Sequence, residues 1–100
     1  MKSIIQEKKE CFICRMNYNV ETISALHEHH IFEGTGRRKQ SEKFGLKVWL
    51  CVRHHNLYNG SEAVHFNKAL DLELKQLAQK KFEETYTRDE FRKHFIKSYL

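Results

Sequence analysis

The segment LKVWLCVRHH, residues 46–55, combines a strand pattern with a cysteine and two adjacent histidines. Leu46, Val48 and Leu50 alternate with other residues, which is the period of a strand that buries one face. The polar residues 53–59 then predict a short helix that ends at Gly60. Potential metal ligands therefore fall at the junction of a strand and a helix.

A second pair of potential ligands, Cys11 and Cys14, has the same two-residue gap as Cys51 and His54. Zinc takes four ligands in a tetrahedron, and a two-residue gap lets one tight turn present two of them. Three thiolates and one imidazole form a closed set, which is typical of a structural site. We therefore predict a structural zinc ion, which would add folding energy to a small core. The alternative is buried free thiols beside an ordinary histidine.

Composition limits the classes of protein to consider. The chain has 100 residues, which suits one domain, and its three cysteines cannot all pair internally. No apolar run approaches the roughly 18 residues of a membrane span, and the start of the chain lacks a signal-peptide pattern. We expect a cytoplasmic protein without a membrane partner. The net charge of +5 favours an anionic partner such as nucleic acid.

The rest of the chain predicts one more strand, before residue 46, and helices after residue 61. We expect a tight turn at 11–16, a strand within 23–32 and a basic loop over 33–45. Beyond Ser61 apolar residues recur at helical spacing, namely Leu70, Leu74, Leu77, Ala78 and Phe82, with Asn67 or Asp71 as candidate caps. Thr87 and Glu90 form a capping-box pattern before another helix with Phe91, Phe95 and Ile96.

These elements predict an α+β fold in a single domain over residues 1–100. Residues 11–60 would form a β-hairpin and helix braced by zinc, and residues 61–100 a helical hairpin that covers them. If strand, zinc site and helix fold together, His29, His30 and His55 can meet in one pocket. Imidazoles with open coordination positions hold a divalent cation, and a free histidine can deprotonate water.

The order of these motifs resembles a known family. A CxxC pair, then HHI, a loop and LxVxLCxxHHN is similar to the HNH nucleases of the ββα-metal (His-Me finger) superfamily, in their zinc-knuckle form. The stretch over residues 27–56 looks like small HNH proteins of phages and prophages of Gram-positive bacteria. The resemblance covers residues 11–60 through motifs and extends more loosely to the C-terminus.

The resemblance implies a DNA endonuclease that acts in phage DNA processing or recombination. His30 matches the general base that activates water, and His29 and His55 match ligands of one catalytic divalent cation, Mg²⁺ or another. Asn59 and His65 are further candidate ligands. The products would carry 5′-phosphate and 3′-hydroxyl ends. The expected substrate is double-stranded or branched DNA, and a homodimer or a phage protein is a possible partner.

Two features depart from the family. The asparagine that orients the base is absent, because Ser41, Lys43, Gly45 and Lys47 occupy its neighbourhood. Regular pleating also points neighbouring strand residues to opposite faces. By pleating alone, the histidines at 27 and 29 share one face, and the glutamate at 28 lies beside the histidine at 30.

Basic and aromatic residues suggest how nucleic acid would bind. Arg37, Arg38, Lys39 and Lys43 follow the expected base, and we expect them to contact phosphate oxygens, with a solvated charged turn as the alternative. We expect Trp49 to pack under the C-terminal helices, with stacking on a base as the alternative. Two other functions remain open: a non-catalytic zinc-knuckle protein that binds nucleic acid, and a scaffold in a larger assembly.

Overall fold

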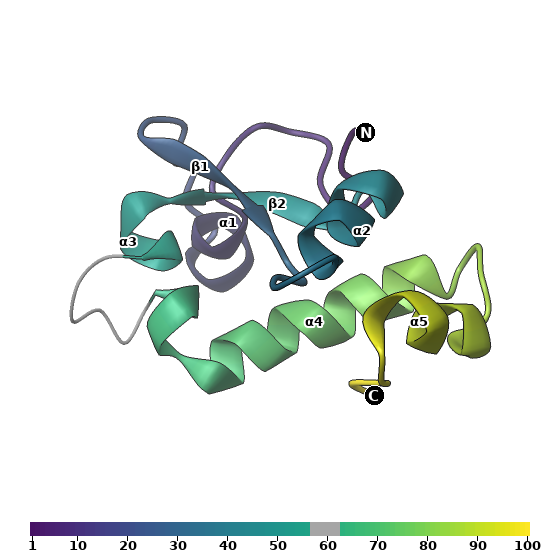
Figure 1. The fold of residues 1–100 in the computed structure, drawn as a ribbon. Coiled ribbons are helices and arrows are strands. Elements are labelled where there is room, and N and C mark those ends of the chain that lie inside the picture. Colours follow the sequence, from purple (N-terminus) through teal and green to yellow (C-terminus); the bar gives the residue numbers. More distant parts are fainter. Residues whose placement is uncertain (57–62) are drawn as a thin grey trace.

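The computed structural model describes residues 1–56 and 63–100, and its fold is α+β, as predicted (Figure 1). In this part of the chain, β1 (Leu26–His30) and β2 (Lys47–Cys51) form a two-stranded antiparallel sheet. The helices are α1 (Phe12–Tyr18), α2 (Arg37–Phe44), α3 (Val52–His55), α4 (Lys68–Phe82) and α5 (Arg88–Phe95), and the short 3-10 helix η1 (Val64–Phe66) precedes α4.

The alternation of side chains along β1 decides which histidines share a face, and the register of the sheet decides what lies opposite them. His29 lies opposite Val48, and both side chains are buried on the inner face. His30 lies opposite Lys47, one position along, so its side chain points to the other face. The predicted buried face is confirmed, since Leu46, Val48 and Leu50 are 0%, 1% and 0% exposed. The other face is also covered at Lys47, which is 8% exposed.

The prediction of a loop over 33–45 was wrong for most of that segment, which forms α2. Positive φ angles at Gly36 and Gly45 flank the helix. The buried Ser41 hydroxyl accepts from the backbone N–H of Phe32 and donates to its carbonyl, which ties α2 to the end of β1. The sequence showed no apolar periodicity here because this contact needs only one small polar residue on the inner face.

The segment from Cys11 to Met16 forms a helix rather than the predicted tight turn. Helix α1 begins directly after Cys11, whose sulfur accepts from the backbone N–H of Cys14. An acceptor at the N-cap satisfies a backbone N–H that has no partner within the helix. The two cysteines of the motif therefore still lie side by side, at the start of α1.

Helices follow the hairpin, as predicted, and α4 runs beside it (Figure 1). Asn67 caps α4 by accepting from Leu70, and Thr87 and Glu90 form the expected capping box of α5. An aromatic cluster joins these helices to the end of β1 and to α2; its buried members are Phe32, Phe82, Phe91 and Phe95, with Phe44 against them. These rings form the part of the core that lies between the C-terminal helices, α2 and the end of β1.

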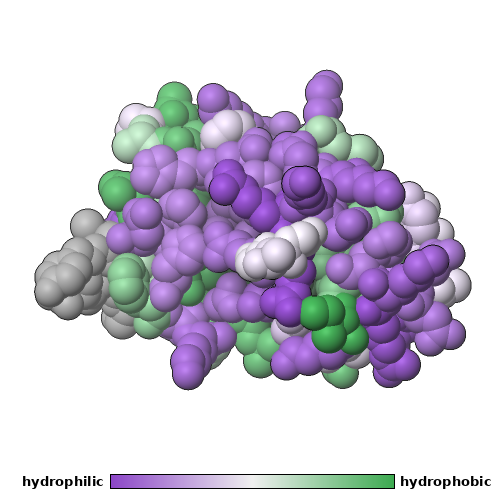
Figure 2. Space-filling model, in the orientation of Figure 1, coloured by the Kyte–Doolittle hydropathy of each residue, from purple (hydrophilic) through white to green (hydrophobic). Residues whose placement is uncertain are grey.

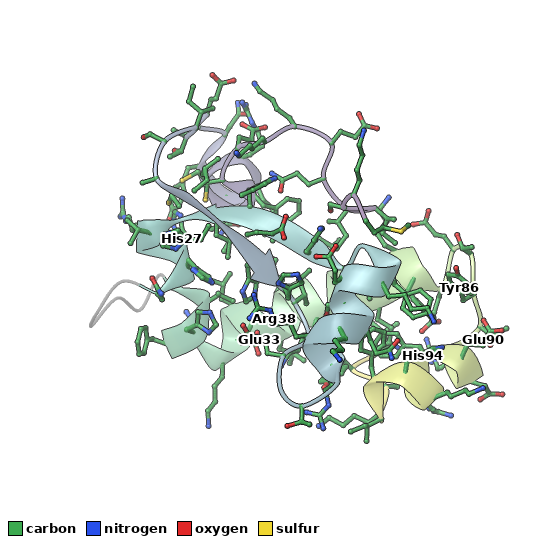
Figure 3. All side chains as sticks on the ribbon, turned by 45° about the horizontal axis from the view of Figure 1, so that its top comes forward. His27, Glu33, Arg38, Tyr86, Glu90 and His94 are labelled. Atoms are coloured by element: carbon green, nitrogen blue, oxygen red, sulfur yellow. The ribbon has the colours of Figure 1, made fainter. Side chains whose placement is uncertain are left out.

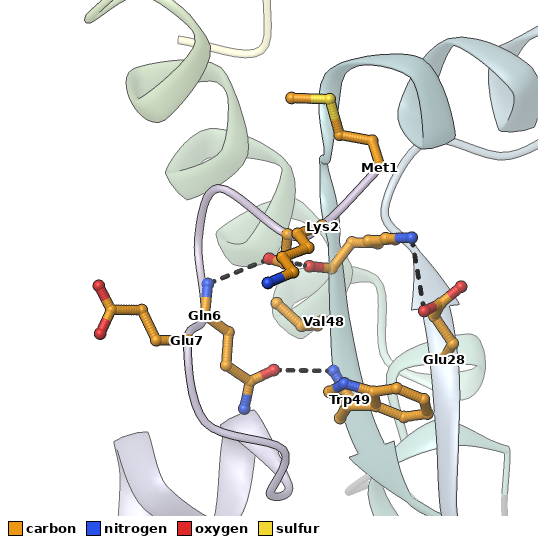
Figure 4. Close-up of a pocket in the computed structure, with 9 residues that line it drawn as sticks. Met1, Lys2, Gln6, Glu7, Glu28, Val48 and Trp49 are labelled. Carbon is orange, nitrogen blue, oxygen red and sulfur yellow. Dashed lines mark hydrogen bonds and ion pairs between the residues drawn. The ribbon is translucent and has the colours of Figure 1, made fainter.

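The N-terminal segment packs along the hairpin. Gly45 accepts from the backbone N–H of Ile4, and a Cβ atom at Gly45 would clash with the backbone oxygen of Lys2. Trp49 faces this segment and not the C-terminal helices, so that prediction was wrong (Figure 4). Its backbone N–H donates to Gln6, and the Lys9 ammonium lies 4.4 Å from the centre of its ring.

Candidate functional site

Four donor atoms meet where α1, β2 and α3 join, and we call this set the knuckle: Cys11, Cys14, Cys51 and His54. All four side chains are buried. The Nδ1 atom of His54 lies 3.5, 3.3 and 3.4 Å from the sulfurs of Cys11, Cys14 and Cys51. The sulfurs of Cys14 and Cys51 are 3.8 Å apart.

These distances match the edges of a zinc tetrahedron. With Zn–S of about 2.3 Å and Zn–N of about 2.0 Å, tetrahedral geometry separates two sulfurs by about 3.8 Å and a sulfur from a nitrogen by about 3.5 Å. Burial raises the pKa of the Cys11 thiol to about 12, so a cation is needed to hold a thiolate there. The donor set therefore fits a structural metal ion such as zinc.

A second group of potential ligands lies beside the knuckle and consists of three imidazoles. His29 comes from β1, His55 from α3 and His65 from η1, and one nitrogen of each lies within 4.8 Å of the others. We call these residues the histidine cluster. Helix α3 links the two sites, because His54 belongs to the knuckle and the next residue belongs to the cluster.

Two of the cluster's imidazoles are oriented toward a common point. The Nε2 atoms of His55 and His65 are 3.0 Å apart. On the opposite side of each ring, Nδ1 of His55 is 3.0 Å from Nδ1 of His27, and Nδ1 of His65 is 3.6 Å from the Glu33 carboxylate. Metal-binding histidines commonly have such a partner on the second nitrogen, which fixes the ring and its tautomer.

The third imidazole, His29, is 1% exposed, and neither of its nitrogens has a hydrogen-bond partner in the described residues. Burial, with the neighbouring His55 as the next cause, lowers the pKa of His29 to about 3. Burial likewise lowers the pKa of His55 to about 4. Both rings are therefore neutral at pH 7, which is the protonation state that binds a metal ion.

His30 does not join the histidine cluster but belongs to a charged network on the other face of the hairpin. Its Nε2 atom lies 2.9 Å from the Glu42 carboxylate and 3.8 Å from that of Glu28. The buried Lys47 ammonium is 2.9 Å from Glu42 and 3.5 Å from Glu28. Hydrogen bonds from the N-terminal amine, His30 and Lys47 hold the pKa of Glu42 well below its usual range.

A shallow hollow opens at His30, lined by His30, Arg38, Lys39 and Glu42, with a volume of about 360 Å³. Figure 3 shows Arg38 and Glu33 near the end of β1, and His27 toward its start. Two of the predicted phosphate-binding residues thus border this hollow. The face of the molecule seen in Figure 2 is mostly hydrophilic, and its apolar residues form small separate groups.

Several partners of the predicted site residues were not evident from the sequence. Glu33 and Glu42 were not singled out, and His27 was not among the predicted site residues. Period-two pleating did pair the histidine at 27 with that at 29, and Glu28 with His30, as the structure has them. The predicted ligand Asn59 lies outside the described residues.

Comparison with known proteins does not assign this chain to a family. No protein-family model, no curated protein and no solved structure matches it. In residues 1–56 and 63–100, no helix has the length and apolar composition to cross a bilayer. What the geometry supports directly is a small α+β fold with a Cys₃His cluster suited to zinc, beside a cluster of three imidazoles.

Proposed function

We propose that this protein is a metal-dependent endonuclease that hydrolyses the phosphodiester bonds of DNA, with a zinc-braced ββα-metal core of the HNH type. The observation that carries the proposal is the convergence of His29, His55 and His65 from three separate elements. A zinc knuckle that only binds nucleic acid has no need for three additional imidazoles that converge in one place.

The donor set argues for a particular class of catalytic cation. Magnesium prefers carboxylate, carbonyl and water oxygens, whereas imidazole suits zinc, nickel and other transition metals. We therefore expect a transition metal at the histidine cluster and not Mg²⁺. When bound there, such a cation polarises a phosphoryl oxygen and stabilises the charge that develops on the leaving oxygen. The protein holds the three rings so that the cation keeps open coordination positions for a phosphoryl oxygen.

His30 is the candidate general base. It is the last residue of β1, so a phosphate held at the histidine cluster must lie at this end of the strand for His30 to act on it. Glu42 determines which nitrogen of His30 is available. An ionised carboxylate only accepts hydrogen bonds, so the Nε2 atom 2.9 Å from Glu42 carries the hydrogen. The lone pair is then on Nδ1, which can accept a proton from water. Glu42 thereby takes the place of the asparagine that the family uses to orient its base.

The residues around His30 also suit a polyanion. Arg38 and Lys39 line the hollow at His30, so a phosphate drawn to them would lie near the base. Lys43 is exposed at the end of the same helix, and Arg37 is partly buried at its start. Helix α2 therefore presents side chains that can neutralise backbone phosphates without reading base sequence.

The direct test is cleavage of supercoiled plasmid by the zinc-loaded protein, with Mg²⁺, Mn²⁺, Ni²⁺ or Zn²⁺ added in turn. We expect nicked or linear product, and more of it with a transition metal than with Mg²⁺. His29→Ala should weaken Ni²⁺ binding by at least about tenfold in a calorimetric titration, with cleavage partly restored at high Ni²⁺. A matched control is His94→Gln, since His94 packs on Phe44 outside both sites. DNA binding without cleavage under every metal would instead support the non-catalytic function.

Glu42 provides a separate test of the proposed base. Glu42→Ala should lower kcat by about tenfold to a hundredfold, by analogy with the partners that orient metal-binding histidines. Glu42→Gln keeps an oxygen that can accept from Nε2 and should retain most of the activity. KM and Ni²⁺ affinity should change little in both variants. Equal losses in the two would mean that the carboxylate acts through its charge and not by orienting His30.

A further inference from the structure

A small hollow opens beside the histidine cluster, on the side of the C-terminal helices. Its lining comes from the residues after β1, from η1 and from α4: Ile31, Glu33, Val64, His65, Lys68, Asp71 and Lys75. We call it the His65 hollow, and its volume is about 170 Å³, enough for a phosphate group. The family motifs do not include α4, so the proposed nuclease core leaves this feature unexplained.

Two lysines of α4 provide its positive charge. The Lys75 ammonium is held 2.8 Å from the Asp71 carboxylate, one turn away on the same helix, and its side chain is only 24% exposed. It also lies 5.4 Å from the centre of the Tyr99 ring. Its charge reaches the buried His29, where it is one of the smaller causes of the lowered pKa. Lys68 is exposed at the start of α4.

We propose that the His65 hollow binds a backbone phosphate of the nucleic acid, next to the phosphate at the histidine cluster, through Lys68 and Lys75. This inference rests on the proposed function and extends the binding surface to α4. The hollow adjoins the cluster because they share His65, so neighbouring phosphates of one strand can occupy the two positions.

The acidic residues of the hollow are compatible with this role. Glu33 faces Nδ1 of His65, where it would orient a metal ligand. Asp71 is the present partner of Lys75 and would compete with a phosphate for it. Removing the Asp71 carboxylate should therefore strengthen DNA binding. If the ion pair of Asp71 and Lys75 only stabilised the fold, its removal would not strengthen DNA binding.

The experiment measures the affinity of a short labelled DNA duplex as a function of salt, in a His30→Ala background so that bound DNA stays intact. Each lost phosphate contact should reduce the slope of log K against log salt by about 0.9. Lys68→Gln and Lys75→Gln should each weaken binding by about eightfold at 0.1 M salt, if affinities converge near 1 M. Lys75→Arg should keep the affinity that Lys75→Gln loses, and Asp71→Asn should bind DNA more tightly than the His30→Ala background.

Lys80→Gln is the matched control, because it removes the same charge from an exposed position of α4 on a different surface. An unchanged slope for Lys68→Gln and Lys75→Gln, equal effects of all three lysine variants, or no DNA binding at all would overturn the proposal. Plasmid cleavage by the protein with native His30 is scored separately. Binding that depends on these lysines without any cleavage would reject the nuclease and keep the phosphate site.

Discussion

Replacing Cys14 by serine is expected to remove the structural zinc and to unfold the N-terminal half of the protein. A serine hydroxyl is a poor zinc ligand at neutral pH, so the variant should not hold the ion. The three remaining donors are then buried together without the positive charge of zinc to stabilise them. Structural zinc contributes about 10–16 kcal/mol in small zinc-finger peptides, which is as large as the whole stability of many domains. Elemental analysis should give about one tightly held zinc per native chain and none in the variant.

Thermal unfolding followed by circular dichroism tests the same expectation. The Cys14→Ser protein should show reduced helix content and no cooperative transition, whereas His94→Gln, outside the knuckle, should keep its zinc. A Cys14→Ser protein that melts at the native temperature would reject the structural role of the metal. The knuckle also holds α3, which carries His55, so a strong chelator that removes zinc should abolish Ni²⁺ binding at the histidine cluster as well.

The second large effect is expected for His30→Ala, with a loss of about 10²–10⁴ in the rate of DNA cleavage, the usual contribution of a general base. Zinc content, the melting temperature and Ni²⁺ affinity should be close to native, because His30 lies on the face opposite the cluster. Excess Ni²⁺ should not restore the activity of His30→Ala, whereas it should partly restore that of His29→Ala. Initial rates of plasmid nicking at saturating metal measure the effect.

His27→Ala is the informative comparison, because His27 lies on the same face of β1 as His29 and contacts His55. As a partner of a metal ligand it should cost about tenfold to a hundredfold in Ni²⁺ affinity, with activity largely restored by added metal. If His27→Ala instead abolishes cleavage at saturating Ni²⁺ while His30→Ala remains active, the base lies on the cluster's face of the strand. The assignment of His30 would then be wrong.

Local sequence patterns predicted the parts of this molecule that depend on near neighbours. The two-residue gaps identified all four knuckle donors, because a single turn brings such residues together. Alternation identified the buried face of β2, and the capping patterns at Asn67 and Thr87 identified the starts of two helices. In each case the interacting residues are only a few positions apart. By contrast, α2 was missed because it is tied to the core through Ser41 and Phe44, and in a helix of otherwise polar residues these two form no apolar period.

Tertiary structure alone decided which distant residues each histidine meets. The family pattern grouped His29 with His30, but the pleat of β1 separates them, so that His29 meets His55 and His65 and His30 meets Glu42. These partners are brought together by the register of the hairpin and by the packing of η1 and α2 beside it. No local periodicity encodes such contacts, since they depend on where distant segments pack after the chain has folded.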